Sequence, residues 1–318
     1  MLRIEREYKM NNKIIKYVGV IITFITFVFI GKSLLSMNLD IKYISNPIFA
    51  IVLIILLSFG YAIIVFISSY AWKLTLEFIY KGKLSAREII PVYVKSNIGK
   101  YLPGNVMHFA GRNILAGKLG FKQLDITFCT LIEILMLIFT DGILSLVFAL
   151  KSFKLVFKEV FSKLNLSIVY GISIIALSLI VFIIVLLVKK TGFIKSYQHL
   201  FSKSFLKLLC KLFCIYSLTL IVPGIFLIVI LKQILGCNIS LEISMFIITA
   251  YTISWVSGFI VPGAPGGLGV RESVLLLILG PFYTSNIVLL AAILLRITSI
   301  IGDLLAFLVP THSYVNKA

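Results

Sequence analysis

The chain has 318 residues, of which 60% are hydrophobic and only 13% are charged. A soluble domain is closer to half apolar and a quarter charged, so the composition excludes an ordinary soluble domain and indicates an integral membrane protein. The formal net charge is +18. Because no separate basic domain exists to bind nucleic acid, we assign the lysines to loops that set topology and contact anionic lipids, and we expect no nucleic-acid partner.

Membrane-spanning helices need about 20 consecutive apolar residues. The amino terminus is basic and then apolar, without a convincing small-residue cleavage site, so we read it as an uncleaved first span. We expect a multi-pass protein of the cell (cytoplasmic) membrane with no separate soluble domain. Apolar runs of sufficient length lie at about 14–35, 47–72, 124–150, 166–188, 205–231, 240–261 and 283–309.

The first interruption of the apolar pattern is the stretch GKYLPGNVMHFAGR, from Gly99 to Arg112. Backbone groups left without partners in hydrocarbon cost several kcal/mol each, so an irregular segment at this depth must face protein or a water-filled cavity. A short helix is expected to begin near Asn105, and its first amides would form an anion site together with Arg112. Asn97, Gly104 and Asn105 flank this interruption and are assigned to the same binding site.

The segment that follows, 124–150, contains two acidic residues, Glu133 and Asp141. Ionisable residues within spans are candidate functional residues by default. Their faces on the helix lie about 80° apart by helical geometry. Glu133 is either a proton-coupling carboxylate or a partner for Arg112, and the residues alone do not separate these two roles.

The second interruption, GFIVPGAPGGLGVR, runs from Gly258 to Arg271 and repeats the first at a constant offset of 159 residues. Arg112 and Arg271 are equivalent under this offset, which also superimposes three pairs of apolar segments. We therefore predict an all-α protein of two repeats, at about 10–158 and 166–312, within one membrane domain. Paired Gly/Pro interruptions in two repeats are the best sequence indication of a transporter's binding site.

Lysine and arginine positions test whether the interruptions cross the membrane. If both turn back, 18 basic residues lie on the inside and 7 outside; if both cross, the counts become 15 and 10. The first arrangement is favoured, with three spans and one re-entrant element in each repeat, six full spans and two re-entrant elements in all. The two repeats would then be inverted, and both termini would be cytoplasmic. Segment 240–261 is nevertheless apolar enough to span.

A second short helix is expected to begin near Gly269, and its first amides would bind an anion together with Arg271. Glu272, Gly267 and Gly269 are assigned to the same site. The alternative is that Arg271 pairs with Glu272 or Asp303 to hold the halves together. Arg296 and Asp303 lie seven apart in the last helix. They form either a bridging pair or separate ties to neighbouring helices.

The stretches NIGKYLPGNVMHFAGR and PGAPGGLGVRES resemble the two signature regions of the flippase-like membrane family, which includes the transmembrane region of lysylphosphatidylglycerol synthase. The resemblance covers about residues 10–312. It implies translocation of a phospholipid or glycolipid between leaflets, and it points to Arg112, Arg271 and Glu272. The aminoacyl-transfer domain of the synthase is missing from this chain, so the resemblance implies no aminoacyl-lipid synthesis.

The leading hypothesis is a lipid flippase or scramblase for an anionic phospholipid or a polyprenyl-phosphate-linked glycolipid. No Gly-x4-Gly-Lys-Ser/Thr motif occurs, so either an ion gradient supplies any uphill drive or transport is passive. Glu133 and Asp141 are the candidates for coupling, and no cofactor or metal is expected. The alternatives are a non-catalytic partner of a glycosyltransferase or lipid synthase, and a membrane-embedded lipid-phosphate transferase.

Overall fold

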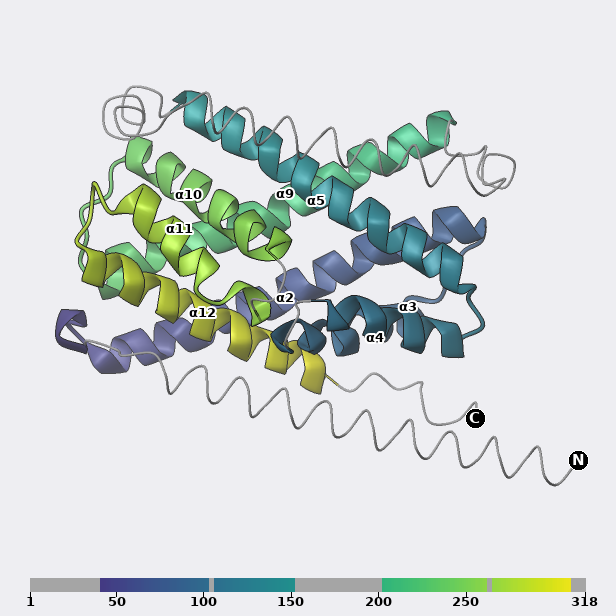
Figure 1. The fold of residues 1–318 in the computed structure, drawn as a ribbon. Helices are drawn as coiled ribbons and strands as arrows, with labels where there is room; N and C mark the ends of the chain where they lie inside the picture. The colour runs from purple at the N-terminus through teal and green to yellow at the C-terminus, as the bar shows by residue number, and fades with distance from the viewer. Residues whose placement is uncertain (1–40, 103–105, 152–201, 262–264, 310–318) are drawn as a thin grey trace, which may run out of the picture.

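The computed structural model describes residues 41–102, 106–151, 202–261 and 265–309. All regular elements in these ranges are helical (Figure 1). Five helices are long and apolar enough to cross a membrane: α2 (Pro47–Tyr80), α5 (Gln123–Lys151), α9 with η4 (Lys203–Val229 and Ile230–Ile234), α10 (Leu241–Ile260) and α12 (Ser285–Leu308). The predicted all-α membrane class is therefore found. The expected spans at 14–35 and 166–188 lie outside the described residues.

The long helices begin at side chains that satisfy their first free amides. Asn46 caps α2 by accepting a hydrogen bond from the amide of Phe49 at 3.1 Å, and Pro47 occupies the first helical position, where its missing N–H costs nothing. Ser202 and Ser240 cap α9 and α10 in the same way. These polar caps fix where each long apolar helix starts.

The outward surface of α2 is apolar. Ile48 is 77% exposed, Leu56 64% and Ile63 60%, although the opposite side of the helix is packed in the core. Such a continuous apolar face is unfavourable in water and is typical of a helix that contacts lipid. The described part of the chain thus supports a membrane protein independently of helix length.

Short elements lie at the first interruption. Helix α3 (Ala86–Asn97) precedes it, and η2 (Ile98–Tyr101) and α4 (Met107–Lys118) contain its two ends. At 1.5 Å per residue, α3 and α4 are each about 18 Å long, too short to cross a hydrocarbon core of about 30 Å. The second interruption differs, because the 20-residue helix α10 precedes η5 (Pro265–Gly267) and the short α11 (Val270–Leu279). The length of α10 is sufficient for a full crossing, as the sequence indicated.

The short helices α3, α4 and α11 pack against the long ones. Figure 1 shows α12 beside α2, with the α3–α4 pair toward one end of the long helices and the α10–α11 pair toward the other. Helix α5 packs against both α9 and α10. Gly302 makes the α2–α12 contact close: a Cβ atom there would lie 2.8 Å from the Ser58 carbonyl oxygen.

Candidate functional site

The two Gly/Pro interruptions meet in the folded chain. Element η2 of the first contacts η5 of the second. Gly266 has a φ of 57°, and a Cβ atom there would lie 3.3 Å from Cδ1 of Tyr101. The positive φ favours glycine, and a side chain here would also press on the ring of Tyr101. Segments more than 150 residues apart in sequence therefore form one site.

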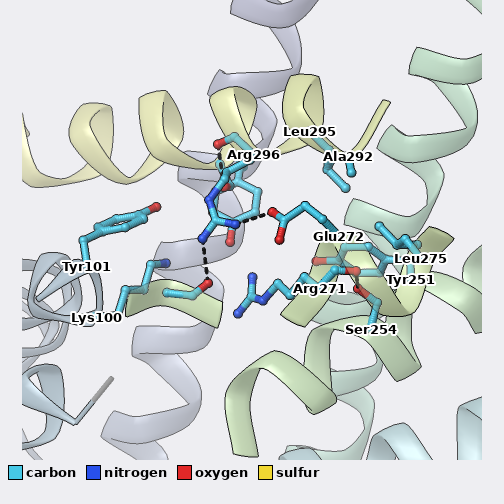
Figure 2. A pocket seen from close by; sticks show the side chains of 13 residues that line it. Lys100, Tyr101, Tyr251, Ser254, Arg271, Glu272, Leu275, Ala292, Leu295 and Arg296 are labelled. Carbon is cyan, nitrogen blue, oxygen red and sulfur yellow. Dashed lines mark hydrogen bonds and ion pairs between the residues drawn. The ribbon is translucent and has the colours of Figure 1, made fainter. Parts of the chain in front are cut away.

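A cavity lies where these interruptions meet (Figure 2). It holds about 570 Å³ of empty space, part of it open to the outside. Its charged lining comes from Lys100 of η2, Arg271 and Glu272 of α11, and Arg296 of α12. The remaining lining residues are Tyr61, Tyr101, Tyr251, Ser254, Gly266, Leu275, Ala292, Leu295 and Ser299.

Arg271 projects its guanidinium into this cavity, and no dashed line reaches that group in Figure 2. Its Nε is buried without a hydrogen-bond partner, and no ion pair joins it to a carboxylate within the described ranges. Its guanidinium carbon lies 5.5 Å from the ring centroid of Trp255, within cation–π range. The alternative in which Arg271 pairs with Glu272 or Asp303 is therefore not the observed arrangement.

Two glycines of the second interruption leave the space that the Arg271 side chain occupies. A Cβ atom on Gly258 would lie 2.5 Å from Cγ of Arg271, and one on Gly267 would lie 2.7 Å from its Nε. The Ser254 hydroxyl donates to the Arg271 carbonyl at 2.9 Å. The Gly-rich sequence of the second interruption thus positions this arginine sterically.

Glu272 has two other partners. It forms an ion pair with Arg296, and its Oε2 accepts a hydrogen bond from the amide of Gly269 at 2.8 Å. Arg296 also donates to the carbonyl oxygen of Gly266 at 3.0 Å. Glu272 thus satisfies the amide of Gly269, the N-cap residue of α11, as in a capping box.

Asp303 joins α12 to the first interruption. Its carboxylate accepts hydrogen bonds from Asn97 Nδ2 at 2.8 Å and Tyr101 Oη at 2.5 Å, and it pairs with Lys100 at 2.7 Å. Burial lowers the pKa of Lys100, and Asp303 opposes this shift. Arg296 and Asp303 therefore hold separate partners, which is one of the two arrangements considered from sequence.

Charges around the cavity do not cancel. Three cations, Lys100, Arg271 and Arg296, stand against two carboxylates, Glu272 and Asp303. Two of the cations are paired, so the excess positive charge resides on Arg271. The nearby positive charge of Arg271 contributes to the lowered pKa of Lys100. The cavity is thus suited to an anion.

Arg112 is placed differently. It is 1% exposed, lines no part of the cavity around Arg271, and forms an ion pair with Glu133. Its guanidinium carbon lies 3.7 Å from the ring centroid of Tyr93, whose hydroxyl donates to Glu133 at 2.8 Å. Of the two roles considered for Glu133, partner to Arg112 is the one found.

The remaining predicted residues fall outside this cavity. Asp141 is buried in α5 and lines neither this cavity nor the one beside it. Gly104 and Asn105 lie outside the described residues. Gly267 and Gly269 have positive φ angles of 75° and 80°, which explains glycine at both positions.

Sequence reasoning missed the tyrosines of the site. Tyr61 and Tyr251 occupy apolar helices and line both the cavity near Arg271 and a second cavity beside it, which Lys100 also borders. Tyr101 lies within the first interruption, and its hydroxyl donates a hydrogen bond to Asp303. Hydroxyl groups within otherwise apolar spans were the available signal, since a buried hydroxyl needs a partner.

Comparisons of the chain with models of protein families, with curated proteins and with solved structures found no match. The functional proposal therefore rests on the geometry of the site.

Proposed function

We propose that this chain is a lipid transporter that binds an anionic headgroup at Arg271 and moves the lipid between leaflets. The substrate class is an anionic phospholipid or a polyprenyl-phosphate-linked glycolipid. The observation that carries the proposal is the guanidinium of Arg271, which lines a cavity where the two interruptions meet and has no carboxylate partner among the described residues.

A charged side chain at membrane depth costs about 2.5–3.5 kcal/mol on insertion scales, so it is retained where a partner compensates it. A phosphate group is the natural partner, because guanidinium binds its oxygens through two parallel hydrogen bonds. Ser254, Tyr61 and Tyr251 add hydroxyl groups around the same space. The motif resemblance to the flippase-like family points to the same class of ligand.

Two inverted repeats form part of the proposal. A shift of 159 residues superimposes α2, α3, α4 and α5 on α9, α10, α11 and α12 in order. The contacts follow the same relation, since α3–α4 corresponds to α10–α11 and α2–α12 corresponds to α9–α5. Rocking of one repeat against the other would expose the cavity alternately to the two sides. Cytoplasmic termini follow from the basic-residue counts.

Leaflet exchange by purified protein in liposomes tests the function. The probes are fluorescent phosphatidylglycerol, which is anionic, and fluorescent phosphatidylcholine, which is zwitterionic. Wild type is expected to exchange the anionic probe faster. Arg271→Ala is expected to slow that exchange by about 10- to 150-fold, since hydrogen bonds to a charged group contribute about 1.5–3 kcal/mol.

The matched control is Arg87→Ala, which removes the same charge from an exposed position at the start of α3. This variant should exchange both probes like wild type. Unchanged exchange of the anionic probe by Arg271→Ala, with folding intact, would reject Arg271 as the headgroup-binding residue.

A further inference from the structure

The two acidic residues of α5 differ in how their charge is compensated. Glu133 has Arg112 as an ion-pair partner and accepts a hydrogen bond from Tyr93. Asp141 is only 6% exposed, and its Oδ1 is buried without a hydrogen-bond partner. No basic residue forms an ion pair with it within the part of the chain that is described. An isolated ionised carboxylate in such a place is strongly disfavoured.

The neighbours of Asp141 at the α5–α10 contact are hydroxyl groups. Ser145 Oγ lies 3.0 Å from Thr252 Oγ1, and the Thr252 hydroxyl donates to the carbonyl oxygen of Thr249 at 3.0 Å. Ser145 lies one helical turn after Asp141 on α5. The polar groups at this contact are therefore uncharged.

The surroundings of Asp141 assign the proton. Its Oδ1 has no hydrogen-bond partner, and no basic residue pairs with the carboxyl group within the described ranges. A buried carboxylate without a compensating cation is strongly disfavoured, whereas a neutral carboxylic acid is tolerated. We therefore expect Asp141 to carry a proton in this arrangement.

The charged and titratable groups nearest the headgroup site lie on the helices packed against α5. Arg112 of α4 forms an ion pair with Glu133, Tyr216 of α9 borders the second cavity, and Tyr61 of α2 borders both cavities. Tyr251 of α10 also borders both cavities, and it directly precedes Thr252, which contacts Ser145 of α5. The α5–α10 contact beside Asp141 therefore lies next to the headgroup site.

We propose that Asp141 is a proton-binding site whose protonation and release couple a proton gradient to headgroup movement at Arg271. The coupling half of this inference rests on the proposed lipid transport. In the described state the carboxyl group is buried and holds its proton. Separation of α5 from α10 would admit water, and the proton would pass from the carboxylic acid to that water, leaving the carboxylate.

Infrared spectroscopy of purified protein tests proton binding without any lipid substrate. Wild type at neutral pH should show the C=O stretching band of a buried carboxylic acid. Asp141→Asn should lose this band and remain folded, because the amide keeps the size of the carboxyl group and carries no charge. Asp125→Asn, on the same helix, is the matched control and should retain the band. The same band in Asp141→Asn would overturn the assignment.

Liposome exchange under an imposed pH gradient tests coupling. If one proton accompanies each lipid, a gradient of about one pH unit sets about a tenfold ratio of fluorescent phosphatidylglycerol between the leaflets. Asp141→Asn should exchange the lipid to an even distribution whatever the gradient. An equal response of variant and wild type would overturn the coupling, as would a wild-type response to a sodium gradient alone.

The two experiments separate the two proposals. If wild type shows the infrared band but moves no lipid, the lipid-transport function and its coupling are both overturned, while proton binding at Asp141 stands. If lipid moves and the band does not depend on Asp141, the function stands and the proton site is rejected.

Discussion

Arg112 and Arg271 occupy equivalent positions in two matching motifs, but only one of them is neutralised by a carboxylate. Arg112 is fully buried against Glu133 and Tyr93. Arg271 lines a cavity and has no carboxylate partner among the described residues. The residue equivalent to Glu133 at the offset of 159 is Ala292, which lines that same cavity. Replacement of one carboxylate by a methyl group leaves both an empty space and an uncompensated charge.

The difference shows that a repeated motif need not repeat a chemical role. In the first half the arginine holds α4 against α5 through a buried ion pair. In the second half the corresponding acid is missing, and the acids nearby pair with Arg296 and Lys100 instead. We therefore expect the first arginine to stabilise the fold and propose that the second binds the ligand, and three sets of variants test this division.

The largest effect is expected from Arg112→Met. Removing one partner of a buried ion pair leaves the other charge without compensation and typically costs about 3–5 kcal/mol. We therefore expect Arg112→Met to lower the thermal unfolding temperature and the folded yield in detergent. Adding Glu133→Gln removes the remaining charge and keeps an acceptor for the Tyr93 hydroxyl.

The double variant should recover most of the lost stability, since neutral replacement of both partners of a buried pair is often tolerated. An Arg112→Met protein as stable as wild type but unable to move lipid would contradict the structural role of this arginine.

The second-largest effect is expected from Ala292→Glu, which restores the missing acid. A carboxylate here would reach the same cavity as Arg271 and neutralise it, as Glu133 neutralises Arg112. Exchange of fluorescent phosphatidylglycerol should fall by about 10- to 150-fold, the value of charge-assisted hydrogen bonds worth about 1.5–3 kcal/mol. Folding should be retained, because the cavity provides space.

Ala292→Gln is the matched control, since it fills the same space without the charge. It should impair exchange much less than Ala292→Glu. Equal losses in the two variants would show that filling the cavity, rather than neutralising Arg271, blocks the lipid.

The sequence was sufficient for the features that composition and spacing encode. Apolar runs predicted the long helices, and the repeated Gly/Pro interruptions indicated where a site would form. The sequence could not predict which charges pair. The pairing of Lys100 with Asp303 and of Arg296 with Glu272 depends on how the helices pack. The different pairing of Arg112 and Arg271 was also hidden. It follows from residues such as Ala292, which carries no chemical signal by itself.

The smallest effects are expected from alanine substitutions at two equivalent glycines, Gly99 and Gly258. A Cβ atom on Gly99 would lie 2.9 Å from the backbone nitrogen of His108, whereas one on Gly258 would meet the Arg271 side chain. Backbone cannot move aside without shifting α4, so Gly99→Ala should cost about 1–3 kcal/mol of stability, as overpacking usually does. The unfolding temperature in detergent measures this loss.

Gly258→Ala should instead displace Arg271, because the arginine stem is the group that it contacts most closely. A displaced guanidinium loses its approach to the headgroup, so exchange of fluorescent phosphatidylglycerol should fall more than stability does. The two alanine variants would then show opposite profiles, stability loss in the first half and exchange loss in the second. If both variants lost stability and exchange to the same extent, the two glycines would have the same role. That result would contradict the proposed difference between Arg112 and Arg271.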